Sequence, residues 1–162
     1  MKVLLLVRHG KSSWEDASLS DADRPLAPRG IKEVPAVAKM INSQKYSPDY
    51  IVSSPTLRTR QTTELLLQGL EIKNPMIVWD TNLYTQQAHF IFKWLKRLDN
   101  DVKTPMLVAH DTFLADLVYM LTNKKVEKFF TSACAVIHLK IDQWSELKES
   151  DNELVHFFHP AK

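Results

Sequence analysis

Four short apolar runs, separated by segments long enough to hold helices, most constrain the fold of this chain. Each run has the length of a β-strand, and the runs span residues 3–7, 50–53, 76–79 and 105–109. Strands that alternate with helical segments are typical of a parallel sheet. Residues 135–141 alternate in polarity, and a short apolar run at 154–158 follows a polar turn, which predicts an antiparallel edge hairpin. The expected fold is therefore α/β: a three-layer α/β/α domain whose mostly parallel sheet carries an antiparallel edge hairpin.

The segments between the apolar runs carry hydrophobic residues at helical spacing. Amphipathic helices are predicted over residues 31–41, 91–98 and 114–121, and Pro55 is expected to begin another. With one hydrophobic face each, these helices would cover the sheet. No repeat or linker divides the 162 residues, so one domain spanning residues 1–162 is expected.

Composition narrows the classes of partner. A net charge of +2 without a block of Lys or Arg gives no reason to expect nucleic acid. The N-terminal apolar run is shorter than a signal-peptide core of about 7–15 residues, so no membrane partner is expected. The single cysteine, Cys134, excludes an intrachain disulfide and fits a reducing compartment, which favours a cytoplasmic location. The oligomeric state stays open.

Cationic and nucleophilic side chains follow three of the predicted strands. Arg8 and His9 come directly after the first, Arg58 follows the second, and His110 follows the fourth. In an open α/β sheet, ligands bind beyond the carboxyl ends of the strands, so these side chains are expected to converge there. A phosphoryl group suits them, because a guanidinium donates to its oxygens through a two-pronged fork.

Each of these residues alone has an ordinary alternative: a structural histidine, or a helix arginine in solvent. The combination of Arg8, His9 and His110 favours a functional site. Arg58 is preferred to Arg60, which should point about 200° around the helix. Arg58 should also lie in the first turn, where free N–H groups favour an anion.

Two other motifs are set aside. Gly10-Lys11-Ser12 resembles the end of a phosphate-binding Walker loop, but Leu5 stands where that loop needs its first glycine. The pair His156 and His159 lacks Cys, Asp or Glu at a recognised metal-site spacing. No metal and no cofactor are therefore assigned.

The ordered motifs of the chain resemble the histidine phosphatase superfamily, whose fold is phosphoglycerate mutase-like. They are Leu6-Val7-Arg8-His9-Gly10, Arg24-Pro25-Leu26, Gly30, Ser53-Ser54-Pro55-x-x-Arg58-x-x-Gln61-Thr62 and Val108-Ala109-His110. The short length, Asp23-Arg24-Pro25-Leu26 and Phe130-Thr131-Ser132-Ala133 are most similar to the SixA-type phosphohistidine phosphatases.

This resemblance implies a mechanism without a metal. His9 would attack phosphorus and become transiently phosphorylated, while Arg8, Arg58 and His110 hold the non-bridging oxygens. Water would then release phosphate. His9 must be neutral to attack, and Arg8 and Arg58 should lower its pKa in the empty site.

Gly10, Ser12 and Arg24 are expected to bind substrate. Gly10 would allow a close backbone approach, and Arg24 would either sit at the pocket edge or fasten the loop around it. Lys11 and Arg29 would add positive potential at the mouth, or would be plain solvated charges.

One departure from the superfamily pattern concerns the leaving group. Many members use an acidic residue after the third strand to protonate the leaving oxygen, and this chain places Asn82 there. An imidazole, with a pKa of about 6.5, leaves without that acid, so phosphohistidine fits. Asp21, Asp80 and Asp111 stay open as alternative acids.

The leading hypothesis is a metal-independent phosphatase that hydrolyses phosphohistidine in proteins, such as a histidine phosphotransfer domain, through phospho-His9. The segments between the strands leave little room for a lid, so an open pocket is expected. Two alternatives remain: a phosphatase for small phosphomonoesters that uses Asp80 or Asp111 as the acid, and a noncatalytic phosphate-binding adaptor.

Overall fold

A single mixed sheet organises the computed structural model, which describes residues 1–160. Its strands are β1 (Lys2–Arg8), β2 (Tyr50–Ser53), β3 (Met76–Trp79), β4 (Pro105–Ala109), β5 (Cys134–Leu139) and β6 (Glu153–Phe158). They lie in the order β3-β2-β4-β1-β5-β6. The first four of these are parallel, whereas β5 pairs antiparallel with both β1 and β6.

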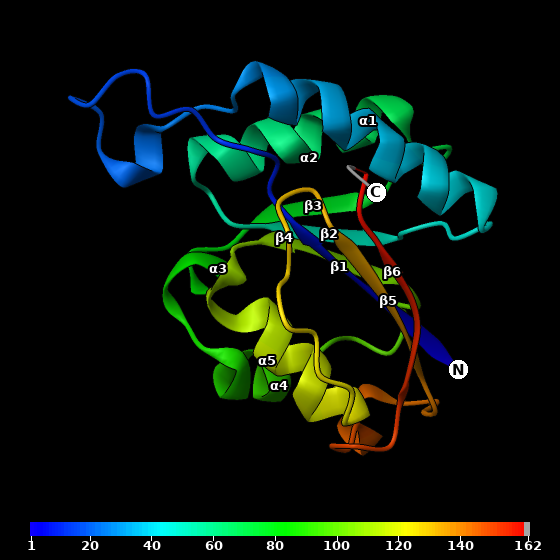
Figure 1. Ribbon diagram of the computed structural model, residues 1–162. Coiled ribbons are helices and arrows are strands. Elements are labelled where there is room, and N and C mark those ends of the chain that lie inside the picture. Colours follow the sequence, from blue (N-terminus) through cyan, green and yellow to red (C-terminus); the bar gives the residue numbers. More distant parts are fainter. Residues whose placement is uncertain (161–162) are drawn as a thin grey trace.

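Helices cover both faces of the sheet (Figure 1). On one face lie α1 (Pro28–Ser43) and α2 (Leu57–Gly69), and on the other lie α4 (Ala88–Leu95) and α5 (Asp111–Thr122). Shorter helical turns are η1 (Asp21–Asp23), α3 (Asn82–Thr85) and η2 (Trp144–Glu146). The predicted three-layer fold with an antiparallel edge hairpin is confirmed.

The apolar run of β1 is continuous because both of its faces are buried. Leu4 and Leu6 pack into the cluster beneath α4 and α5, whereas Leu5 and Val7 pack beneath α1 and α2. All four side chains have 0% exposure. This burial fixes the register of β1 and therefore the position of the residues that follow it.

The connections between the strands differ from the sequence prediction. The predicted polar turn of the hairpin is a longer connection that contains η2, and α3 was not predicted. The apolar strand β3 lies at the sheet edge, where Met76 and Trp79 are exposed.

Within residues 1–160, no helix has both the length and the hydropathy needed to cross a bilayer.

The segment between β1 and α1 bears most directly on the site. It extends away from the sheet as a loop that includes η1 and then returns to α1 (Figure 1). The sequence analysis expected an open pocket, because the segments between the strands leave little room for a lid, and it did not predict this loop. In the structure, residues of the loop line one side of the cavity at the end of β1.

Candidate active site

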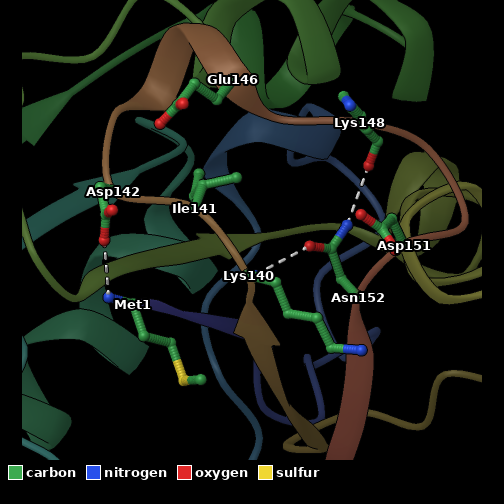
Figure 2. A pocket seen from close by; sticks show the side chains of 8 residues that line it. All are labelled: Met1, Lys140, Ile141, Asp142, Glu146, Lys148, Asp151 and Asn152. Carbon is green, nitrogen blue, oxygen red and sulfur yellow. Dashed lines mark hydrogen bonds and ion pairs between the residues drawn. The ribbon is translucent and has the colours of Figure 1, made fainter.

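Two hollows lie near the two ends of β1. The larger, of about 470 Å³, is at the N-terminal end beside Met1 and is lined mainly by charged side chains of the β5–β6 connection (Figure 2). The smaller, of about 270 Å³, is at the C-terminal end. It is lined by Arg8, His9, Lys11, Ser12, Trp14, Arg24, Arg58, His110, Asp111 and Thr131. The structure thus brings all four predicted catalytic residues to one cavity.

His9 is held by its backbone and by one ring nitrogen. Its N–H donates to the Ala109 carbonyl at 3.0 Å, and its own carbonyl accepts from Ser132 N–H at 3.0 Å. The ring Nδ1 is 2.7 Å from the Gly10 carbonyl oxygen. Because a carbonyl can only accept, Nδ1 carries the proton, and Nε2 keeps a free lone pair for attack.

The electrostatic surroundings keep His9 neutral. Burial, with smaller contributions from His110, Arg58 and Arg8, lowers the pKa of His9 to about 3. The direction agrees with the sequence prediction, but the largest cause is burial rather than the two arginines. A neutral imidazole is the form that can attack phosphorus.

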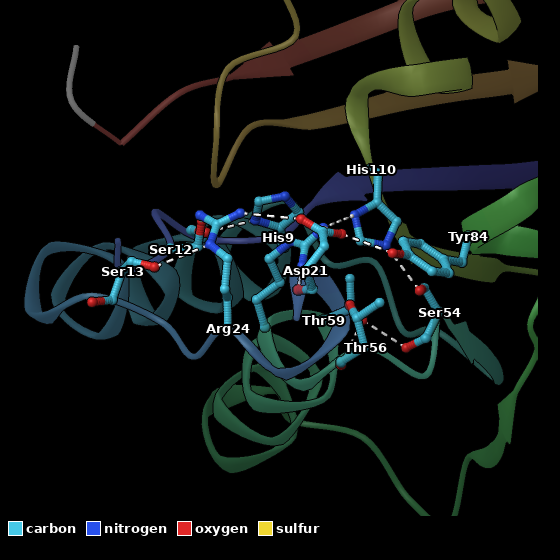
Figure 3. A network of polar contacts seen from close by, with 12 residues as sticks. His9, Ser12, Ser13, Asp21, Arg24, Ser54, Thr56, Thr59, Tyr84 and His110 are labelled. Carbon is cyan, nitrogen blue, oxygen red and sulfur yellow. Dashed lines mark hydrogen bonds and ion pairs between the residues drawn. The ribbon is translucent and has the colours of Figure 1, made fainter. Parts of the chain in front are cut away.

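His110 lies beside His9 in the same cavity, with ring centroids 5.3 Å apart. Its Nε2 is 2.9 Å from the Ser54 hydroxyl, and its Nδ1 is 3.4 Å from Nη2 of Arg58. Figure 3 shows this network of polar contacts, with His110 next to Tyr84 and Ser54. Burial, followed by Arg58, lowers the pKa of His110 to about 4.

The two arginines enter the cavity from different elements. Arg58 lies in the first turn of α2, as predicted, although the helix begins at Leu57 rather than Pro55. Arg8 ends β1 and donates Nη1–H to the Phe129 carbonyl at 2.9 Å. Its Nε is buried and has no hydrogen-bond partner among residues 1–160. Arg60 is exposed beside the Trp79 ring, away from the cavity.

Asp21 is a site residue that the sequence analysis named only as a possible acid. Its carboxylate accepts from Arg58 Nη2 at 2.9 Å, from Tyr84 hydroxyl at 2.8 Å and from Arg24 Nη1 at 3.2 Å. The Tyr84 hydrogen bond and then Arg58 lower the pKa of Asp21 to about 2. Asp21 is therefore ionised near neutrality and orients Arg58 instead of donating a proton.

Arg24 combines the two roles left open for it. It lines the cavity, and it also ties the loop together by donating to the Ser13 carbonyl and the Ser12 hydroxyl. Its guanidinium lies 3.2 Å from the centroid of the Trp14 ring, a cation–π contact. These bonds and one to Asp21 use three of the five N–H donors of Arg24, so it shapes the cavity wall and keeps donors for an anion.

Gly10, which was expected to bind substrate, is not among the residues that line the cavity. Its N–H donates to Thr62 Oγ1 at 3.0 Å. A Cβ at this position would lie 2.9 Å from Val34 Cγ2 and 3.2 Å from Gly30 Cα. The absent side chain therefore allows the β1 end to pack against α1. Arg29 also lies outside the lining and pairs with Glu33 on α1, whereas Lys11 is part of it.

Asp80 and Asp111, the other two candidate acids, differ in their position relative to the cavity. Asp80 accepts from the Asn82 N–H at 2.9 Å, and neither residue lines the cavity. Asp111, the first residue of α5, does line it. Among residues 1–160, no three His, Cys, Asp or Glu side chains are placed to hold a metal ion.

Sequence comparison finds a match over residues 4–81 to the family model described as histidine phosphatase superfamily (branch 1). Phosphohistidine phosphatase SixA of Escherichia coli (strain K12) is 25% identical over 141 residues, which cover 86% of each chain.

Two solved structures share the fold over nearly the whole chain. The putative phosphohistidine phosphatase SixA from Agrobacterium tumefaciens has a TM-score of 0.83 at 24% identity, covering 98% of both chains. The protein histidine phosphatase SixA complexed with tungstate also has a TM-score of 0.83 at 24% identity, covering 98% of this chain and 97% of the other.

Proposed function

From the match over residues 4–81 and the shared fold, we propose that this chain is a member of the histidine phosphatase superfamily and acts as a metal-independent phosphohistidine phosphatase. One observation carries the proposal. The Gly10 carbonyl fixes the proton of His9 on Nδ1, so that a neutral Nε2 is presented in a cavity shared with Arg8, Arg58 and His110. A related protein with this fold has been solved with tungstate, a tetrahedral oxyanion like phosphate.

In the first step, Nε2 of His9 attacks phosphorus in line, and the bond from phosphorus to the substrate imidazole breaks. A substrate ring that carries a proton on its other nitrogen departs as neutral histidine. The charge on the equatorial oxygens is stabilised by Arg8 and Arg58, which are aimed at the cavity before the reaction begins.

The second step uses the same leaving-group chemistry. Phospho-His9 keeps a proton on Nδ1, because the Gly10 carbonyl accepts it throughout. Water then attacks phosphorus, its proton passes to solvent, and His9 departs as a neutral imidazole. The leaving group is an imidazole in both steps, so neither step needs a carboxylic acid to protonate it, and the ionised Asp21 is compatible with turnover.

The proposed substrate is a folded protein, such as a phosphorylated histidine phosphotransfer domain in a signalling relay. Two cavity-lining residues, Lys11 and Trp14, are exposed, and Trp14 has 72% exposure. A partner can therefore reach the cavity mouth. The single cysteine, the buried Cys134, supports action in a reducing compartment, for which we propose the cytoplasm.

The test measures phosphate release from a phosphorylated histidine phosphotransfer domain. We expect His9→Ala to reduce release to the rate without enzyme, whereas His89→Ala, an exposed histidine on α4, stays within about twofold of wild type. Acid-labile label on wild type, and its absence from His9→Ala, would identify phospho-His9. Tight binding of the phosphorylated domain without label or release would instead identify an adaptor.

A phosphatase for small phosphomonoesters is the second candidate, because Asp111 lines the cavity and its carboxyl could protonate an ester oxygen. Steady-state kinetics with a sugar phosphate and with phosphohistidine compare the two. A higher kcat/KM for the sugar phosphate, lost in Asp111→Asn, would select this function. We expect the higher kcat/KM for phosphohistidine, with Asp111→Asn affecting it little.

A further inference from the structure

The two ring nitrogens of His110 face different surroundings. Its Nε2 is directed to the Ser54 hydroxyl, and Ser54 has 0% exposure and does not line the cavity. Its Nδ1 is directed to Arg58, which does line the cavity. A phosphoryl group in the cavity therefore meets His110 at the Nδ1 edge.

In the empty site, the proton of His110 is on the other nitrogen. A guanidinium has no acceptor, so at the 3.4 Å contact Arg58 Nη2 donates and Nδ1 accepts. The proton of the neutral ring is then on Nε2 and is donated to Ser54. An unprotonated Nδ1 and a phosphoryl oxygen are both acceptors, so the empty-site arrangement does not suit a bound phosphoryl group.

We propose that His110 takes up a proton on Nδ1 when a phosphoryl dianion binds, and that Ser54 is the positioning residue for this change. The inference rests on the proposed phosphate-binding role of the cavity. Protonation turns Nδ1 into a donor toward the anion and leaves Nε2–H donating to the Ser54 hydroxyl. The bond to Ser54 becomes charge-assisted and hence stronger, so Ser54 stabilises the bound form more than the empty one.

The charges around His110 keep its ring neutral in the empty site and allow it to gain a proton when an anion binds. Arg58 on α2 and Arg8 at the end of β1 oppose a positive charge on the ring, whereas Asp21 on η1 favours it. The His9 and Tyr84 rings pack at 5.3 and 5.2 Å from its centroid. A bound dianion adds two negative charges to this balance and offsets the two arginines.

The experiment is a calorimetric titration with tungstate, a dianion that does not titrate near neutrality. Carried out at pH 7.5 in buffers of different ionisation enthalpy, it counts the protons taken up. We expect close to one proton per anion for wild type and close to none for His110→Asn. Proton uptake that persists in His110→Asn and is lost in His9→Asn would overturn the assignment, as would no uptake by wild type.

Ser54 is tested in the same titration. Ser54→Ala should bind tungstate about tenfold or more weakly and take up fewer protons, because the imidazolium loses its acceptor. Ser54→Thr keeps the hydroxyl and should restore both values. The matched control is Ser53→Ala, since the buried Ser53 hydroxyl bonds the Ser54 carbonyl and does not touch the ring.

A Ser54→Ala protein with wild-type affinity and wild-type proton count would refute the role of Ser54. None of these readings requires turnover. A protein that binds tungstate with proton uptake and yet releases no phosphate from phosphohistidine would contradict the proposed function only.

Discussion

β1 begins and ends with a cation, and the two cations have different surroundings. Lys2 has 1% exposure, and its ammonium donates to the carbonyls of Asn100 and Val102 at 2.7 and 3.1 Å. Arg8, at the other end, donates one hydrogen bond to Phe129, while its buried Nε has no partner among residues 1–160. The carbonyls around Lys2 satisfy a structural charge, whereas Arg8 keeps donor capacity for an anion.

The hollows beside these two residues show that size does not identify the site. The hollow near Lys2 is larger, about 470 Å³ against about 270 Å³, but its charged Asp142 is 95% exposed. In the smaller cavity, His9, Arg58 and His110 each have 5–6% exposure. Side chains that water would otherwise solvate have been brought together there, which is typical of a functional site.

The largest expected difference between the two ends concerns activity. Arg8→Ala should lower kcat/KM for phosphohistidine by about 10²–10³, as expected for loss of one preorganised donor to the equatorial oxygens. Its urea unfolding midpoint should stay close to that of wild type, because Arg8 makes only one hydrogen bond to Phe129. Steady-state kinetics and urea titration measure the two effects. If Arg8→Ala lowered the urea midpoint as well as kcat/KM, Arg8 would also have a structural role, and the two ends of β1 would not differ in function.

Acid should destabilise the site end of the sheet. The pKa of His9 is about 3 and that of His110 about 4 in the folded protein, against about 6.5 when unfolded. Between these values the unfolded chain binds more protons, so the free energy of unfolding falls as pH falls from about 6.5. From pH 6.5 to 5, the pair should contribute a loss of about 2–4 kcal/mol.

Urea unfolding at pH 6.5 and pH 5 checks this loss, with a variant lacking both imidazoles as the control. The free energy of unfolding of that variant should depend less on pH than that of wild type. An equally steep fall in the variant would assign the acid sensitivity to other groups and weaken the contrast.

At the N-terminal end, Lys2→Met should have the opposite effect to Arg8→Ala: it should lower stability and leave activity unchanged. The two carbonyls lose their donor, which should lower the free energy of unfolding by about 1–3 kcal/mol. kcat/KM should stay within about twofold, because the substitution lies at the far end of the strand. A large loss of activity without a loss of stability would mean that this end contributes to the site.

The sequence predicts the parts of the site that follow regular elements. His9, Arg58 and His110 come directly after strands or in the first turn of a helix, and parallel strands end at the same edge of a sheet. Periodicity therefore sufficed to bring them together.

Only the structure reveals the contacts that three other residues make in the site: Asp21, Tyr84 and Ser54. Asp21 reaches Arg58 from a loop without hydrophobic periodicity, and Tyr84 lies in the four-residue helix α3. Ser54 stands in a recognisable motif, but only the orientation of the His110 ring reveals its contact. Gly10 was assigned to substrate because a glycine allows a close backbone approach, while its packing against Gly30 depends on the path of α1.

The smallest expected effect tests the larger hollow directly. Asp142 Oδ1 lies 3.6 Å from the N-terminal ammonium in an ion pair, and both groups are largely exposed. Exposed ion pairs of this kind contribute little, because water screens them and their side chains lose conformational freedom on pairing. Asp142→Asn should therefore leave the urea midpoint unchanged and kcat/KM within about twofold of wild type. If it lowered phosphohistidine turnover as much as Arg8→Ala, the larger hollow would have to contact the substrate. The burial of charged groups would then no longer separate the functional end of β1 from the structural one.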